Sequence, residues 1–201
     1  MKLFSDRAYR FIRDLAVVLF RFAHPVVKVK GRKNIPEGAA VVCCNHSAFS
    51  DPIYLIGYAR RRDPMRIMAK QELMDIPFLG WLYLKLGAIP LDRGGNDLVA
   101  IKTAMKTLRE GTKLVIFPEG TRIRKGKKSE PHSGAAMLAI RTGTPVLPCY
   151  VTAKKRPFCR INVVYGKPYM PETTCPKPGN EELQKISEEL MEKIYALGEK
   201  P

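Results

Sequence analysis

The first part of the chain has the periodicity of an amphipathic helix. Between residues 3 and 23, apolar side chains recur every three or four positions, and charged side chains follow a different face. The apolar face consists of Phe4, Ala8, Phe11, Leu15, Val18 and Phe22. A basic helix of this kind can lie in a membrane interface, or it can pack on its own domain. We favour the membrane interface, because the whole region up to Lys33 is rich in basic residues.

Short apolar runs then alternate with helical patterns. The continuous apolar run at 39–44 predicts a buried strand, and the helix that follows is expected to begin with Asp51 as its N-cap. Further strands are expected at 66–69, 87–91, 113–117, 146–151 and 160–165, the last of them as an edge strand. Helical or irregular apolar structure is expected around 76–86, and further helices are expected after Asn96 as an N-cap, at 134–141 and at 183–197. This alternation predicts an α/β fold in which helices flank a largely parallel central sheet.

The charge balance indicates a polyanionic partner. The chain has 35 Lys and Arg against 19 Asp and Glu, a formal net charge of +16. Such a surface attracts nucleic acid, an anionic membrane or a phosphorylated substrate. Basic residues cluster at 60–62, 124–128 and 154–156, and such clusters are either solvated faces or contacts for phosphate groups. Because no aromatic residues are interleaved with them and no binding module is evident, we expect no nucleic-acid partner.

Other sequence features bear on the compartment and on metals. No apolar run approaches the roughly 20 residues that span a bilayer, so we expect no membrane-spanning segment. The five cysteines are odd in number and show no C-x-x-C spacing, which favours reduced thiols in the cytosol. The three histidines are scattered and no Cys/His spacing fits zinc, so we expect no metal site.

Polar residues follow several of the predicted strands, at the edge of the sheet where α/β proteins bind ligands. His46 and Asp51 come after the strand at 39–44. A carboxylate five residues beyond a histidine, across a turn, can fix the imidazole tautomer and stabilise the imidazolium, which suits a general base. Alternatively, Asp51 is only a helix cap and His46 a loop residue. The sequence has no nucleophile elbow, so a base at His46 would take its proton from a substrate hydroxyl.

A second group of candidates follows the strands at 113–117 and 87–91. Arg93 follows the strand at 87–91. Arginine offers a planar, permanently charged fork that suits a phosphate, and Glu119 can orient Arg122 or bind a substrate hydroxyl. The alternative is a charged surface turn. The candidates after the strand at 113–117 are Glu119, Gly120, Thr121 and Arg122.

Four segments, taken in order, make the chain resemble the glycerolipid acyltransferase family, specifically the 1-acyl-sn-glycerol-3-phosphate acyltransferases. They are Asn45–Asp51, which carries N-H-x-x-x-x-D, Gly87–Arg93, Phe117–Arg122 and Val146–Tyr150. With its flanks, the resemblance extends from Gly31 to Gly166. The chain departs from the family around residues 132–134, where the family often has a basic residue ahead of the glycine.

The resemblance implies a direct acyl transfer. His46, oriented by Asp51, would remove the proton from the sn-2 hydroxyl of lysophosphatidic acid. The hydroxyl oxygen would then attack an acyl thioester and give phosphatidic acid and a free thiol. The acyl donor would be acyl-coenzyme A or acyl-carrier protein as a co-substrate, with no other cofactor.

The resemblance also implies how the acceptor is held. Arg93 and Arg122 would bind the acceptor phosphate, and Lys70, after the strand at 66–69, is a further candidate. The residues expected to shape the phosphate pocket are Glu119, Gly120 and Thr121.

The implied organisation has two parts, a membrane-associating helix at 1–30 and a catalytic domain at 31–201. It corresponds to a peripheral enzyme on the cytoplasmic face of the cell membrane, with an anionic membrane surface, lysophosphatidic acid and the acyl thioester donor as partners. Two alternatives remain open. One is transfer to glycerol 3-phosphate or another lysolipid by the same residues, and the other is a non-enzymatic basic protein that binds anionic membrane or nucleic acid.

Overall fold

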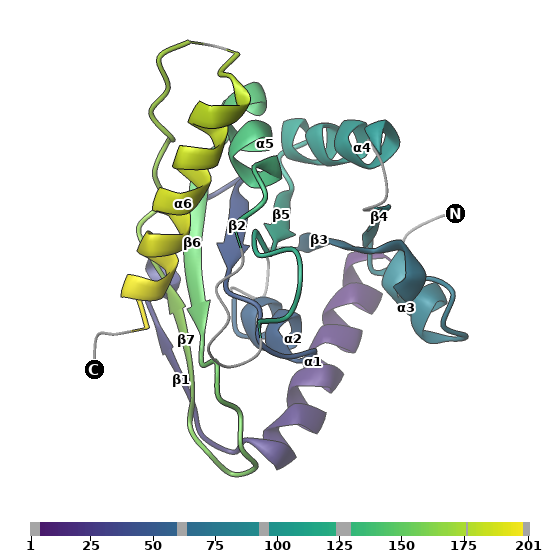
Figure 1. Cartoon of the computed structure of the whole chain (residues 1–201). Coiled ribbons are helices and arrows are strands. Elements are labelled where there is room, and N and C mark those ends of the chain that lie inside the picture. The colour runs from purple at the N-terminus through teal and green to yellow at the C-terminus, as the bar shows by residue number, and fades with distance from the viewer. Residues whose placement is uncertain (1–4, 60–63, 93–96, 124–129, 176, 199–201) are drawn as a thin grey trace.

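The fold is built around one seven-stranded sheet (Figure 1). The computed structural model describes residues 5–59, 64–92, 97–123, 130–175 and 177–198. From one edge to the other, the strands are β1 (Val27–Lys30), β7 (Ile161–Tyr165), β6 (Val146–Val151), β2 (Val41–Cys44), β5 (Lys113–Ile116), β3 (Met65–Lys70) and β4 (Ile89–Leu91). Neighbouring strands run parallel except β6 and β7, which are antiparallel. The predicted α/β fold with a largely parallel sheet is confirmed.

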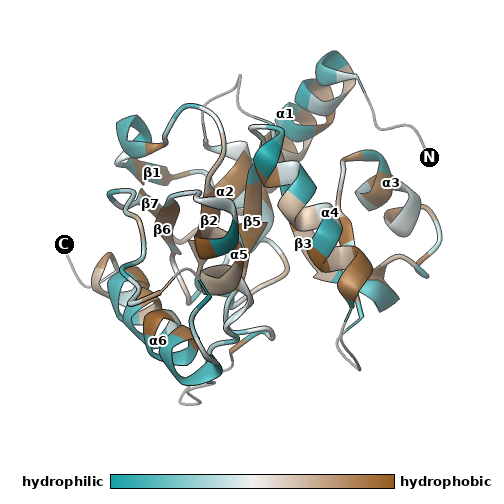
Figure 2. Ribbon diagram, turned by 90° about the horizontal axis from the view of Figure 1, so that it is seen from above, coloured by the Kyte–Doolittle hydropathy of each residue, from teal (hydrophilic) through white to brown (hydrophobic). Residues whose placement is uncertain are grey.

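Helices cover both faces of this sheet. They are α1 (Asp6–Ala23), α2 (Asp51–Gly57), α3 (Leu79–Lys85), α4 (Leu98–Arg109), α5 (Gly134–Thr142) and α6 (Asn180–Ala196), with short 3-10 turns at Arg32–Asn34 and Gln71–Leu73. Seen from above in Figure 2, α1 and α6 lie on opposite sides of the strands. The buried clusters agree with this view. One contains residues of α2 and of the sheet face on which α1 packs, and the other contains residues of α4, α5 and α6.

Strand β2 shows why the central strands read as uninterrupted apolar runs. Val42 and Cys44 pack with Tyr54 of α2 in one buried cluster. Val41 and Cys43 belong to the cluster on the other face, with residues of α4, α5 and α6. All four strand residues are fully buried. Since helices cover both faces, the strand has no solvent-facing positions and shows no polar alternation.

The strand expected at 160–165 is not an edge strand. Strand β7 pairs with β6 on one side and with β1 on the other, in a register that places Val27 beside Ile161. Strand β1 forms the edge instead. Its valines are partly buried and its lysines are exposed, so its four residues alternate as a half-covered strand does. The segment 1–30 therefore contributes an edge strand to the sheet as well as helix α1.

Helix α1 packs on the domain through a different face from the one that the apolar pattern defines. Tyr9 exchanges hydrogen bonds with the backbone of Met65, of 3.0 Å to its oxygen and 3.1 Å from its nitrogen. Phe20 meets Tyr54 of α2 edge-on, with the ring centroids 6.1 Å apart. Of the apolar face, Phe11 and Phe22 are exposed at 68% and 77%, and Leu15 and Val18 are exposed too. Phe4 lies outside the described residues. Within the described part of the chain, no helix combines the length and apolarity needed to cross a bilayer.

Helix α4 begins one residue later than expected. Its N-cap is Asp97, whose carboxylate accepts a hydrogen bond of 2.9 Å from the amide of Ala100. An aspartate in this position satisfies one of the free amides of the first turn. Asn96, the expected cap, lies outside the described residues.

Candidate active site

Three loops meet at the carboxyl ends of β2, β5 and β6. Asn45, directly after β2 and 2% exposed, donates to the backbone oxygen of Val151 at 3.0 Å and accepts from its amide at 2.9 Å. In the loop after β5, the amide of Ile123 donates to the backbone oxygen of His46 at 2.8 Å. Because these bonds tie the loops together, side chains from three distant segments share one site at the expected edge of the sheet.

His46 and Asp51 form a hydrogen-bonded pair. Nδ1 of His46 lies 3.0 Å from Oδ2 of Asp51, and the carboxylate is fully buried. The same oxygen accepts from the amides of Ser47, at 2.6 Å, and Ala48, at 2.7 Å. A carboxylate held in this way fixes the ring, and a proton on Nδ1 leaves the lone pair of Nε2 free to accept a proton.

The alternative in which Asp51 is only a helix cap is not supported. The N-cap of α2 is Ser50, and Asp51 is the first residue of the helix. Its carboxylate accepts from the loop that precedes the helix, at Ser47 and Ala48, and from the ring of His46. The carboxylate therefore organises the loop around the histidine.

Lys155 is a third member of this cluster that the sequence analysis did not identify. Its ammonium forms an ion pair with Oδ1 of Asp51 and donates to Oγ of Ser47 at 2.9 Å and to the backbone oxygen of Thr152 at 2.6 Å. Its side chain is 6% exposed, so it does not belong to the solvated basic face expected at 154–156. The sequence feature that could have identified Lys155 is its position after strand β6, at the same edge of the sheet as His46.

The environment of Asp51 favours its ionised form. Burial raises the pKa of the carboxyl, but the hydrogen bond with His46, the charge and hydrogen bond of Lys155 and the amide of Ala48 together outweigh burial, and the pKa lies below its ordinary value. The carboxylate is thus charged and available to stabilise an imidazolium at His46.

Glu119 supports the same histidine from the loop after β5. Oε2 of Glu119 accepts from the backbone amide of His46 at 2.6 Å, and Oε1 accepts from the hydroxyl of Tyr195 on α6. Glu119 is 2% exposed. Burial raises the pKa of this carboxyl, although the bonds from Tyr195 and His46 oppose that rise. These contacts give Glu119 a role in placing the histidine loop, and Tyr195 is a second residue that the sequence analysis missed.

Phe117 and Gly120 shape the surroundings of the histidine. The ring of His46 stacks on that of Phe117, with centroids 4.3 Å apart and planes 26° from parallel. Gly120 has a φ of +66°, and a Cβ there would lie 2.3 Å from the ring of His132. Both the backbone conformation and the close approach of His132 require glycine at this position.

Of the candidate phosphate ligands, Arg122 is the one that the structure places against the histidine loop. Thr121 and Arg122 are exposed, and the guanidinium of Arg122 lies over the ring of Phe49, 5.0 Å from its centroid, on the same loop as His46. Lys70, at the end of β3, is half-exposed and forms an ion pair of 2.5 Å with Glu72. Arg93 lies outside the described residues.

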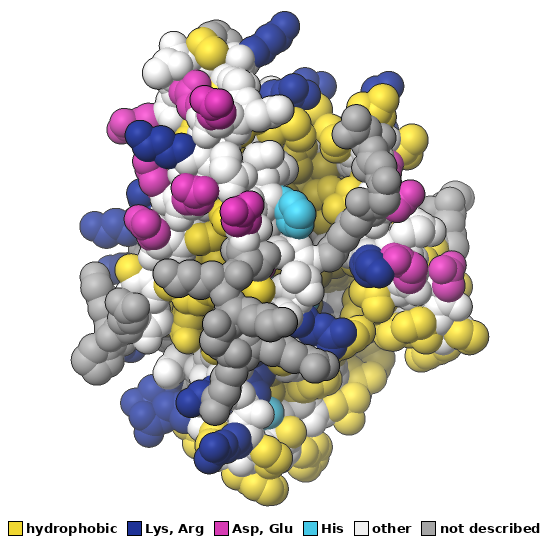
Figure 3. Space-filling model, in the orientation of Figure 1, with side chains coloured by type: hydrophobic (Ala, Val, Ile, Leu, Met, Phe, Trp, Pro, Cys, Tyr) yellow, Lys and Arg dark blue, Asp and Glu magenta, His cyan; other side chains and the backbone are white. Residues whose placement is uncertain are grey.

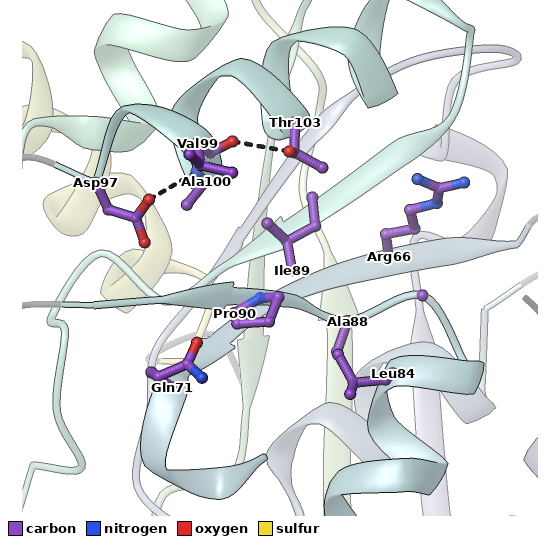
Figure 4. A pocket seen from close by; sticks show the side chains of 11 residues that line it. Arg66, Gln71, Leu84, Ala88, Ile89, Pro90, Asp97, Val99, Ala100 and Thr103 are labelled. Carbon is purple, nitrogen blue, oxygen red and sulfur yellow. Dashed lines mark hydrogen bonds between the residues drawn. The ribbon is translucent and has the colours of Figure 1, made fainter. Parts of the chain in front are cut away.

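A cavity of about 510 Å³ lies beside strand β4 (Figure 4). Its wall combines apolar residues such as Leu84 and Ile89 with Asp97 and Thr103 of the α4 region. Asp97 caps α4, and Thr103 donates to the backbone of Val99 at 2.7 Å. Neither His46 nor Asp51 lines this cavity, so it is separate from the proton-transfer cluster.

Comparisons with known proteins agree with the fold. A family model described as acyltransferase matches residues 26–152. The chain is 36% identical over 125 residues to the 1-acyl-sn-glycerol-3-phosphate acyltransferase of Pseudomonas aeruginosa, a match that covers 60% of this chain and 47% of that protein. The chain thus spans about half the length of this relative.

Other relatives match over more of their length. The 1-acyl-sn-glycerol-3-phosphate acyltransferase of Bacillus subtilis is 30% identical over 180 residues, which cover 87% of this chain and 89% of that protein. The crystal structure of the 1-acyl-sn-glycerophosphate acyltransferase of Thermotoga maritima superposes with a TM-score of 0.72 at 25% identity, covering 96% of this chain and 80% of that one. Because the family model spans more than half of the chain and includes the loops that carry His46, Asp51 and Glu119, the chain belongs to the acyltransferase family.

Proposed function

We propose that the protein transfers a fatty acyl group from a thioester to the sn-2 hydroxyl of 1-acyl-sn-glycerol 3-phosphate and so forms phosphatidic acid. The observation that carries the proposal is the hydrogen-bonded pair of His46 and Asp51 within the segment that matches the acyltransferase family. The proposed acceptor is the one for which the relatives from Pseudomonas aeruginosa and Bacillus subtilis are named.

In this reaction, Nε2 of His46 takes the proton of the acceptor hydroxyl while Asp51 stabilises the resulting imidazolium. The hydroxyl oxygen bonds to the carbonyl carbon of the thioester. The carbon–sulfur bond then breaks, and the proton held by His46 passes to the departing sulfur. The products are the ester and a free thiol, and no acyl-enzyme forms.

The acceptor phosphate is proposed to bind at the rim of the site. Arg122 lies on the loop that is tied to His46 through the amide of Ile123, and its guanidinium suits a phosphate. Arg93 and Lys70 are further candidate ligands. The backbone of Gly120 and the hydroxyl of Thr121 would complete the phosphate pocket.

We also propose a peripheral position on the cytoplasmic face of a membrane, and the surface of the molecule supports the contact with a membrane. Hydrophobic side chains gather over α1 along the lower edge and over α3 on the right in Figure 3. The exposed side chains on α1 include Phe11 and Phe22. Phe158 lies beside the end of this helix, because its backbone amide donates to the backbone oxygen of Ala23, and its side chain is 76% exposed. An apolar helix face in a protein with a net charge of +16 favours binding to an anionic bilayer.

Thiol release by the purified protein in nonionic detergent micelles tests this function. With acyl-coenzyme A, we expect release only when lysophosphatidic acid is added, together with phosphatidic acid in the lipid extract. Acyl-carrier protein thioesters, glycerol 3-phosphate and a lysophosphatidylcholine, run beside it, identify the donor and the acceptor. Faster transfer to glycerol 3-phosphate would contradict the proposed acceptor, and a lack of release with every pair would contradict the proposed activity.

A further inference from the structure

Lys155 places a positive charge inside the site, on the side of Asp51 that His46 does not occupy. Oδ2 of Asp51 bonds the ring of His46, and Oδ1 pairs with the ammonium of Lys155. The two side chains of the ion pair are 0% and 6% exposed. Lys155 lies in the loop that follows β6, beyond residues 26–152, which the family model matches.

The hydrogen bonds of the Lys155 ammonium are all made within the protein. A lysine ammonium has three donors, and three oxygens receive them: Oδ1 of Asp51, Oγ of Ser47 and the backbone oxygen of Thr152. Two of these acceptors belong to the histidine loop and helix α2, and the third belongs to the loop after β6. Lys155 therefore joins the histidine loop and the start of α2 to the loop after β6, and it holds Asp51 through the carboxylate oxygen that does not bond His46.

We propose that Lys155 is a positioning residue that keeps Asp51 charged and aimed at His46 while the histidine accepts and returns the proton. This inference rests on the proposed acyl transfer. Lys155 does not contact the substrate in the mechanism. It acts through the carboxylate.

Charge balance explains why such a residue is useful. A buried carboxylate without a compensating cation is costly, because little water reaches it. At this site the carboxylate of Asp51 and the ammonium of Lys155 sum to no net charge. Without Lys155 the same site would carry one negative charge, and the pair of Asp51 and His46 would bind a proton more tightly. The base would then stay protonated at a higher pH.

The other titratable groups around the pair leave this balance unchanged near neutral pH, apart from Glu119. Burial raises the pKa of the Cys44 thiol of β2, and burial raises that of Tyr54 of α2 to about 12, so both are neutral. Burial also raises the pKa of Tyr195 on α6. Glu119, from the loop after β5, bonds the backbone of His46 and remains in place in every variant below.

Lys155→Met removes the charge and keeps much of the apolar stem. We expect kcat, measured by thiol release in nonionic micelles, to fall by about 10- to 100-fold. Groups that orient metal-binding histidines from behind have effects of this size. The KM for the acceptor should change little. We also expect the acidic limb of the pH–kcat profile to move to higher pH. Lys167→Met is the matched control, because it removes one charge from an exposed lysine.

Two further variants separate positioning from a general structural effect. Lys155→Arg retains the charge, so its acidic limb should stay near that of the wild type even if its rate is lower. In the Asp51→Asn background, Lys155→Met should cost no further activity, because Lys155 acts through Asp51. Thermal unfolding of each variant checks that it is folded.

Several results would overturn the inference. One is that Lys155→Met has the same rate and pH profile as Lys167→Met. Another is that the losses of activity from Asp51→Asn and Lys155→Met multiply in the double variant. A third is that the acidic limb moves as far in Lys155→Arg as in Lys155→Met. If Lys155→Met does not fold, the Lys155→Arg profile decides on its own. A wild-type protein without activity on any acceptor would instead contradict the proposed function.

Discussion

The hydroxyl of Tyr195, near the end of the last helix, donates a hydrogen bond to Oε1 of Glu119 in the loop after β5. The other oxygen of Glu119 accepts from the backbone amide of His46. Helix α6 is thereby connected to the proposed base through one buried carboxylate. This connection gives the C-terminal helix a part in the site beyond its packing against the sheet.

Replacing Tyr195 with phenylalanine should weaken this support. The change removes a donor from a buried carboxylate, and we expect the free energy of unfolding to fall by about 1–3 kcal/mol. Urea unfolding at pH 7 measures the loss, and thiol release should decrease with it because the histidine loop is less firmly held. Tyr83→Phe is the control, since the Tyr83 hydroxyl bonds no other described residue. Equal stability of the two variants would contradict the role of the Tyr195 bond.

Arg122→Ala should act on the acceptor. A hydrogen bond between charged groups is worth roughly 1.5–3 kcal/mol, so KM for lysophosphatidic acid should rise by about 10- to 100-fold while kcat changes little. Initial rates over a range of acceptor concentrations, at fixed acyl-coenzyme A, give both parameters. Arg141→Ala removes an exposed arginine from α5 and serves as the control. An unchanged KM would exclude Arg122 as a phosphate ligand.

The buried Asp51 carboxylate should make stability depend on pH in a defined window. Its pKa is lowered below the ordinary value of 3.8, so its ionised form stabilises the native state above that value, and the stabilisation is lost as the pH falls below it. The difference in free energy of unfolding between the wild type and Asp51→Asn should therefore be constant above about pH 5 and shrink below about pH 4. Denaturant unfolding at several pH values measures it. A difference that grows on acidification would show that the carboxylate is destabilised in the fold.

The exposed face of α1 should control membrane binding without affecting the fold. Phe22→Ser removes an exposed apolar ring, and we expect binding to anionic vesicles to weaken by about 1.5–3 kcal/mol, measured by sedimentation with the vesicles. Leu98→Ser removes an exposed apolar side chain from α4 and should leave binding unchanged. Phe20→Ser should instead lower the unfolding temperature, because Phe20 packs on Tyr54. Equal vesicle binding by Phe22→Ser and the wild type would place the contact elsewhere.

The parts of the fold that could be predicted are those whose environment is uniform along the element. Strand β2 is buried on both faces, so its apolar run is unbroken and identifies it as a central strand. Strand β1 was missed because it has four residues, alternates valine with lysine and lies in a basic segment. Without β1, β7 was expected at the edge. The apolar face of α1 was found correctly, but whether it faces the domain depends on tertiary contacts such as that of Tyr9 with Met65.

In the site, a contact between neighbours in the sequence could be predicted, and contacts between distant segments could not. His46 and Asp51 are five residues apart on one turn, so their spacing alone allowed the pairing to be predicted. Lys155 and Tyr195 reach the cluster only because β6 lies beside β2 and α6 packs against β6. Lys155 is one of 35 basic residues, and its sequence neighbours do not distinguish the buried amine from the exposed ones.

The most direct test of the account is the activity of purified His46→Ala. In thiol release with acyl-coenzyme A and lysophosphatidic acid, we expect the rate to fall by about 10²- to 10⁴-fold or more, the contribution of a positioned general base, while thermal unfolding stays close to that of the wild type. Lys167→Ala, which removes an exposed side chain just after β7, controls for preparation. Turnover by His46→Ala at the wild-type rate, with contaminating activity excluded, would contradict the assignment of His46 as the base and with it the mechanism derived from the His46–Asp51 pair.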